Sequence, residues 1–145
     1  MKKLPQIFLL FSAVLLMSAT WRTDFSKAKT EAKQEHKYIL IKFSGSDWCI
    51  PCIKMEKRIF DKEPFQNYAN GNLILINADF PRQKKNKLDK ELVKANEALA
   101  EQYNKSGHFP YTLLLDANGK VLKTWDGYKD ATPEEFVSEI KAAIK

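Results

Sequence analysis

The chain has 145 residues, of which 44% are hydrophobic and 12% aromatic, with 24 Lys and Arg, 18 Asp and Glu, two Cys and two His. That length is typical of one domain, and this supply of large apolar side chains excludes an intrinsically disordered chain. Two Cys are too few for a small disulfide-stapled scaffold, and two His without paired spacing do not make a four-ligand zinc site. The cysteines therefore need another explanation.

The N-terminal segment has the organisation of a secretory signal. A basic start precedes an uncharged run over 7–17 and a small-residue exit over 18–20. The apolar run is shorter than the roughly 20 residues that span a bilayer. We predict a signal peptide at 1–20, a single domain at 21–145, and export to the cell envelope, the periplasm of a bacterium. Because Met17 stands where signal cleavage favours a small residue, retention as a membrane anchor stays an alternative.

The net charge of the exported part is mildly basic. Its one concentrated basic stretch, 82–87, has no interleaved aromatic residues on which nucleic-acid bases could stack. Nucleic acid is therefore not expected as a partner. A solvated loop is the favoured interpretation of this stretch, with attraction to an acidic partner or a membrane surface as the alternative.

Hydrophobic periodicity predicts an alternation of helices and strands along the rest of the chain. Helices are predicted at 24–37, from the cysteine pair to about Phe60, at 91–104, and after Thr132, with one or two further helical turns at 65–69 that end at Asn70-Gly71. Strands are predicted at 38–43, 73–78, 111–116 and 120–125. Asn118-Gly119 is typical of a hairpin turn, and Thr132-Pro133-Glu134-Glu135 of a capped helix start.

This order of elements indicates an α/β fold. A β-α-β unit implies two parallel strands with a right-handed crossover, and it is joined through a helix to an antiparallel hairpin and a final helix. Helices on both faces of a four-stranded mixed sheet form a three-layer α/β/α sandwich, which is the predicted architecture.

The pair Cys49 and Cys52 carries the chemistry. A Cys-x-x-Cys at the junction of strand and helix places the first sulfur near the helix N-terminus, where free N–H groups favour a thiolate. Cys49 is therefore the expected exposed nucleophile, and the shielded Cys52 can resolve a mixed disulfide formed on it. Pro51 is tolerated in the first helical turn. A structural disulfide or half of a zinc site are the alternatives; the first constrains the chain little and the second lacks further soft ligands.

A proline at the start of the third strand is the second feature. In Phe109-Pro110-Tyr111 a cis peptide could leave the backbone of Phe109 free to pair with an extended peptide. A proline that only marks a strand edge is the alternative. Together with Cys49 and Cys52, the first interpretation is favoured.

From these residues the chain resembles the thioredoxin superfamily. The resemblance covers about 23–145 and rests on Trp48-Cys49-Ile50-Pro51-Cys52, on Phe109-Pro110, and on Gly127 after the fourth strand. Within the superfamily it is most similar to exported bacterial thioredoxin-like proteins and to the periplasmic C-terminal domain of the transmembrane disulfide interchange reductase. Those proteins similarly carry an acid four residues after the second Cys, here Glu56, and a longer connection after the second strand, here 80–90.

The resemblance implies disulfide exchange with disulfide-containing or dithiol proteins. Cys49 attacks, Cys52 resolves, Pro110 is cis, and a substrate groove lies near Trp48, Phe109 and Gly127. No cofactor and no metal is implied, and a monomer is expected. An exported reductant has no soluble nicotinamide supply, so a membrane-embedded thiol transporter is the expected electron donor.

One position departs from the pattern of thioredoxins. They usually carry a buried Asp on the strand before the active site, and the nearest position here is Lys42. Glu56, one turn beyond Cys52, could take over as proton acceptor, or it could be a surface carboxylate or a partner of Lys42. Asp47 could tune Cys49 or cap the helix. His108 is interpreted as a bystander.

The direction of electron flow is the main open alternative. Ile50-Pro51 lacks the histidine that stabilises the reduced thiolate in strongly oxidising relatives, so a protein-disulfide reductase is the favoured interpretation. A disulfide oxidase or isomerase, a non-catalytic peptide-binding module and a metal-binding thiol protein are the alternatives.

Overall fold

One mixed sheet of five strands, in the order β1-β3-β2-β4-β5, forms the centre of the molecule in the computed structural model, which describes residues 18–145. The strands are β1 (Trp21–Arg22), β2 (Tyr38–Ser44), β3 (Leu73–Asp79), β4 (Tyr111–Leu115) and β5 (Val121–Asp126). Residues 1–17 of the predicted signal peptide lie outside the described residues.

The strand directions agree with the predicted β-α-β unit and hairpin. β1, β2 and β3 are parallel, whereas β4 is antiparallel to β2 and β5 is antiparallel to β4. The register pairs Tyr38 with Leu73 at one end and Ser44 with Asp79 at the other. Because parallel strands end at the same edge, the segments after β2 and β3 meet there, beside the start of β4.

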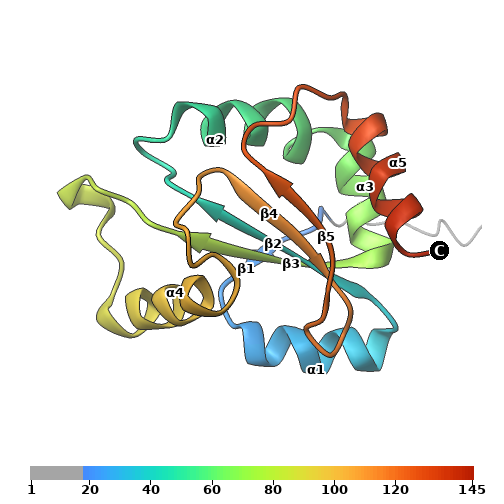
Figure 1. Cartoon of the computed structure of the whole chain (residues 1–145), viewed down its shortest axis with the longest axis horizontal. Coiled ribbons are helices and arrows are strands. Elements are labelled where there is room, and N and C mark those ends of the chain that lie inside the picture. Colours follow the sequence, from blue (N-terminus) through green and yellow to red (C-terminus); the bar gives the residue numbers. More distant parts are fainter. Residues whose placement is uncertain (1–17) are drawn as a thin grey trace, which may run out of the picture.

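Helices cover both faces of the sheet (Figure 1). α1 (Phe25–Glu35) and α4 (Lys90–Tyr103) lie on one face, and α2 (Ile50–Met55), α3 (Glu63–Asn72) and α5 (Pro133–Ala143) on the other. A π-helical turn η1 (Glu56–Phe60) continues α2, and a short 3-10 turn η2 (Lys84–Asn86) follows β3. The predicted three-layer α/β/α sandwich is confirmed. No helix among residues 18–145 is long and apolar enough to cross a bilayer.

Alternation along the strands divides the core into two clusters, because successive side chains of a strand point to opposite faces. Leu40 and Leu114 pack with Phe60, Phe65 and Phe136 beneath α3 and α5. Ile39, Ile41, Leu113 and Leu115 pack with Ala28, Ala32 and Leu99 beneath α1 and α4. Each of the central strands β2 and β4 therefore contributes to both cores.

Two details of the predicted elements are wrong. The sheet has five strands rather than four, because Trp21 and Arg22 add a parallel edge strand beside β3. Two residues are too few for any alternation to be recognised. The helix after Glu63-Pro64 does not end at Asn70-Gly71 but continues to Asn72. Burial of Phe65 and Ala69 outweighs the cost of about 1 kcal/mol of a helical glycine.

Candidate active site

The loop between β2 and α2 places both cysteines at the helix start. The backbone N–H groups of Trp48 and Cys49 donate to the carbonyl of Gly45, at 3.2 and 2.9 Å, which closes the loop. Cys49 is the N-cap of α2, and Pro51 lies in the first turn, where its missing N–H is tolerated. Cys49 and Cys52 are joined by a disulfide.

The first sulfur accepts a hydrogen bond from the helix itself. The backbone N–H of Cys52 donates to Sγ of Cys49 at 3.3 Å. The same N–H can stabilise negative charge on that sulfur once the disulfide opens, together with the partial positive charge of the helix start. This position gives Cys49 the environment of a nucleophilic thiolate.

The expected difference in exposure between the two cysteines is absent in the disulfide form. Cys49 is 4% and Cys52 5% exposed, so the prediction of an exposed Cys49 is wrong for this state. The disulfide holds both sulfurs against the first turn of α2, which explains why neither projects into solvent. Ile50, between them, is 72% exposed.

Four residues proposed for substrate binding come together from three parts of the chain. The Trp48 ring meets the Phe109 ring edge-on, with centroids 5.5 Å apart. The Phe109–Pro110 peptide bond is cis, and the carbonyl of Pro110 accepts from the N–H of Gly127 at 2.9 Å. Gly127 has φ +84°, which other residues rarely adopt. Trp48, Phe109, Pro110 and Gly127 are thus linked into one group that begins at the residue before Cys49.

Trp48 depends on a glycine for its position. A Cβ on Gly45 would collide with the Trp48 indole, so the ring can lie over this residue only if it is glycine. The indole N–H donates to the carbonyl of Phe80 at 2.7 Å. The ring is therefore held in place by its packing over Gly45 of the cysteine loop and by its hydrogen bond to Phe80 in the segment after β3.

Glu56 forms an ion pair with Lys42, which is one of the alternatives that the sequence offered to a role as proton acceptor. The Lys42 ammonium contacts the Glu56 carboxylate and lies 3.9 Å from the centre of the Trp21 ring. Only 8% of the Lys42 side chain is exposed, against 30% for Glu56. Burial lowers the pKa of Lys42, and the negative charge of Glu56 opposes that shift. A buried cation thus stands on the strand before the active site, paired with an acid from the helix.

Cys52 and Glu56 also line a common cavity. It has a volume of about 160 Å³ and is bounded by Ser44, Ser46, Cys52, Ile53, Glu56, Lys57 and Asp61. The π-helical turn begins at Glu56, and π-helical turns occur frequently at functional sites. The cavity gives Cys52 and the Glu56 carboxylate access to the same space.

Asp47 does not cap the helix, since Cys49 itself is the N-cap. The Asp47 carboxylate accepts from the backbone N–H groups of Arg82 and Gln83, at 2.9 and 3.0 Å, and from the amide of Asn86 at 2.9 Å. These hydrogen bonds hold the pKa of Asp47 below its usual range, and the one from the Arg82 N–H has the largest effect. Asp47 thus fastens the basic segment to the cysteine loop.

Arg82 and Phe80 are site residues that the sequence analysis missed. The Arg82 guanidinium lies 3.6 Å from the centre of the Trp48 ring, and the Phe80 ring meets the Phe109 ring at 5.5 Å. The sequence predicts a solvated loop for the basic stretch, with an acidic partner or a membrane surface as the alternative, and no local pattern indicates that Arg82 lies over the distant Trp48 ring. His108 instead pairs with Asp126 at 2.9 Å. Residues 18–145 contain no cluster of three or more His, Cys, Asp or Glu suited to a metal ion.

Residues 25–144 match the family model of the thioredoxin-like domain. The chain belongs to the thioredoxin-like family. Over 122 residues it is 36% identical to the disulfide bond reductase DsbH of Chlamydia pneumoniae, covering 84% of this chain and 71% of that protein.

Solved structures agree with this membership. The structure of a DsbH oxidoreductase superposes with a TM-score of 0.79 at 34% identity, covering 88% of this chain and 85% of that one. The oxidised C-terminal domain of DsbD from Neisseria meningitidis has a TM-score of 0.57 at 17% identity, covering 86% and 99%, which shows a shared fold. With its Cys49–Cys52 pair, this thioredoxin-like protein is a thiol–disulfide oxidoreductase.

Proposed function

We propose that the protein is a disulfide reductase of the cell envelope, exported by its signal at 1–20, that acts on protein disulfides through Cys49 and Cys52. The observation that carries this proposal is the disulfide at the start of α2, in which Sγ of Cys49 accepts the N–H of Cys52. The identity to a protein named as a disulfide bond reductase supports the direction.

The reaction consists of two exchanges. The Cys49 thiolate attacks one sulfur of the partner disulfide; the Cys49–partner bond forms, the partner S–S bond breaks, and the other partner sulfur leaves as a thiolate that takes up a proton. The Cys52 thiolate then attacks Sγ of Cys49 and releases the second partner sulfur. Two electrons pass to the partner, and the Cys49–Cys52 disulfide remains.

The surrounding residues have distinct roles in this scheme. Trp48, Phe109, Pro110 and Gly127 receive an extended partner segment beside the disulfide, and Glu56 accepts the Cys52 proton through the cavity that both residues line. A membrane-embedded thiol transporter returns two electrons to the Cys49–Cys52 disulfide. The domain of residues 21–145 acts as a monomer.

Reduction of insulin with dithiothreitol tests the activity. The wild type is expected to accelerate insulin precipitation, and Cys49→Ser to abolish the effect. Equilibration with glutathione buffers tests the direction: a reductase is expected below about −200 mV, in the range between glutaredoxins and thioredoxin. A value above about −150 mV would indicate an oxidase, and lack of insulin reduction with intact folding would indicate a peptide-binding module.

A further inference from the structure

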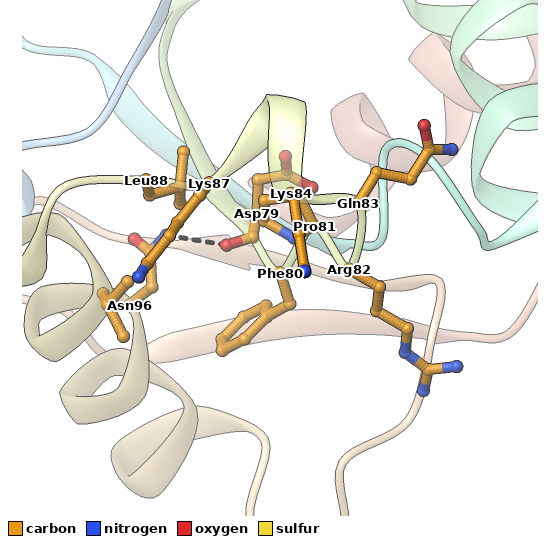
Figure 2. Close-up of a pocket in the computed structure, with 10 residues that line it drawn as sticks. Asp79, Phe80, Pro81, Arg82, Gln83, Lys84, Lys87, Leu88 and Asn96 are labelled. Atoms are coloured by element: carbon orange, nitrogen blue, oxygen red, sulfur yellow. Dashed lines mark hydrogen bonds between the residues drawn. The ribbon is translucent and has the colours of Figure 1, made fainter.

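A second cavity lies between the segment that follows β3 and helix α4 (Figure 2). Its walls include the apolar side chains of Phe80, Pro81, Leu88 and Val93. Its volume of about 250 Å³ is below the roughly 300–1,000 Å³ of typical small-molecule sites, so it suits one large side chain.

A buried amide in the lining has an acceptor without a partner. Asn96, on α4, is 1% exposed, and its Nδ2 donates to the carbonyl of Asp79 at 2.9 Å (Figure 2). Its Oδ1 has no hydrogen-bond partner among the residues that the structure describes. A buried acceptor without a partner is unfavourable, so a ligand that brings a donor to Asn96 gains by satisfying it.

The charge around this cavity is positive. Lys84 and Lys87 line it and are exposed, whereas Arg82 extends away from Asn96 towards Trp48 (Figure 2). The one acid in the lining, Asp79, is already engaged, because its carboxylate accepts from the N–H of Ser46 at 2.9 Å and from its hydroxyl at 2.6 Å. An acidic ligand is therefore favoured at the entrance.

The cavity shares a wall with the active site. Phe80 lines the cavity, while its carbonyl accepts from the Trp48 indole and its ring contacts Phe109. A partner segment held in the cavity would lie directly beside the residues proposed to receive the disulfide.

We infer that this cavity binds a tyrosine side chain presented by an acidic segment of a partner protein. The apolar walls suit the ring, the phenol carries a donor at its tip that matches the unpartnered acceptor of Asn96 in the cavity lining, and Lys84 and Lys87 attract acidic neighbours in the partner. The inference rests on the proposed function in that the partner is a protein that exchanges disulfides.

Fluorescence anisotropy with a labelled cysteine-free peptide, Gly-Asp-Glu-Tyr-Glu-Asp-Gly, tests the cavity by itself. The wild type is expected to bind it, and the peptide with Phe in place of Tyr is expected to bind about 5- to 10-fold more weakly, since one buried hydrogen bond is lost. A peptide with Asn and Gln in place of the acids is expected to bind more weakly and to lose the salt dependence. In NMR spectra, only the Tyr peptide should strongly shift the side-chain amide of Asn96.

Two variants locate the binding. Val93→Phe fills the cavity and is expected to abolish peptide binding, while insulin reduction stays at the wild-type rate. Lys84→Gln with Lys87→Gln is expected to weaken binding at least about 5-fold at low salt. The matched control, Lys33→Gln with Lys105→Gln, removes two exposed lysines elsewhere and should leave binding unchanged.

The proposal is overturned if the Tyr and Phe peptides bind equally well, if neither binds at millimolar concentration, or if folded Val93→Phe binds like the wild type. Because the peptide has no cysteine, these outcomes are independent of redox activity. Failure of insulin reduction with intact peptide binding would instead reject the proposed reductase and keep the tyrosine site.

Discussion

At the residue scale, the two sulfurs of the site have different neighbours. Sγ of Cys49 accepts the N–H of Cys52, whereas Cys52 lines the cavity that also contains Glu56. Exposure does not separate them in the disulfide form, so the roles proposed for them rest on hydrogen bonding and on position in the helix. Cys49 is suited to carry the thiolate, and Cys52 to gain one only when a base removes its proton.

Cys52→Ser should trap mixed disulfides, because Cys49 can still attack while the resolving thiol is missing. Non-reducing electrophoresis of a cell-envelope extract is expected to show adducts that disappear with reductant. The variant with both cysteines replaced serves as control and should show none. If Cys49→Ser traps partners equally well, the two roles are reversed.

Glu56→Gln should slow the release of the mixed disulfide by about a hundredfold near neutral pH, the lower end of what a positioned base contributes. The defect should shrink as pH rises and the Cys52 thiol ionises without help. Stopped-flow turnover across pH measures this, with Glu97→Gln, an exposed acid on α4, as the matched control. A wild-type rate throughout would leave Glu56 only its pairing with Lys42.

Lys42→Met should change how stability depends on pH. Burial lowers the pKa of Lys42 in the folded state, so the unfolded chain binds this proton more tightly. The resulting loss of folding stability is fully present below the folded-state pKa of Lys42. It disappears as pH rises towards about 10.4, the pKa of lysine in the unfolded chain.

The wild type should therefore gain stability relative to Lys42→Met as pH rises through this alkaline window. Urea unfolding at pH 7 to 10.5 measures the difference, and Lys105→Met, at an exposed position, should show no such trend. A constant difference between wild type and Lys42→Met across the window would mean that the buried lysine holds its proton as tightly as in the unfolded chain.

At the element scale, the start of α5 shows how local sequence and structure agree. Thr132 accepts the N–H of Glu135, and the Glu135 carboxylate accepts the N–H of Thr132, which completes the capping box that the sequence predicts. Pro133 occupies the first turn. These contacts involve neighbours in the chain, so no tertiary information is needed to foresee them.

Thr132→Ala should lower the free energy of unfolding by about 1 kcal/mol, since the helix loses its side-chain cap. Urea denaturation followed by circular dichroism measures the change. Ser138→Ala, at an exposed position in the middle of the same helix, is the control and should shift stability by no more than about 0.5 kcal/mol. Equal effects would show that the cap contributes nothing.

At the scale of the whole molecule, the sheet separates two cores. Ile140, on the inner side of α5, packs into the core on one face of the sheet, and Ile39 packs on the face covered by α1 and α4. Both side chains are fully buried. Because the two residues belong to different clusters, a cavity in one core should not be relieved or worsened by a cavity in the other.

Ile39→Val and Ile140→Val should each cost about 0.5–1.5 kcal/mol, and the double variant should cost their sum within about 0.5 kcal/mol. Chemical denaturation of the four proteins, wild type included, gives the comparison. A markedly non-additive double variant would mean that the central strands transmit strain between the cores.

Local pattern by itself determined most of the elements of this protein. The positions of β2, β3, β4, β5, α1, α4 and α5 follow from short apolar runs, the Asn-Gly hairpin signal and helical spacing, and the fold follows from their order, because crossover handedness and short connections leave few alternatives. The cysteine pair at the strand–helix junction likewise follows from neighbours in the chain.

Which distant residues surround that pair depends on how the whole chain folds. Lys42 and Glu56 form an ion pair, Asp47 holds the segment at 82–86, and Arg82 stacks on Trp48, all across separations that periodicity does not encode. Asn96 is buried although its side chain is polar, because the carbonyl of Asp79 at the end of β3 accepts a hydrogen bond from its amide. Such contacts depend on where parallel strands end and which loops meet at that edge, and this is fixed only when the whole sheet has formed.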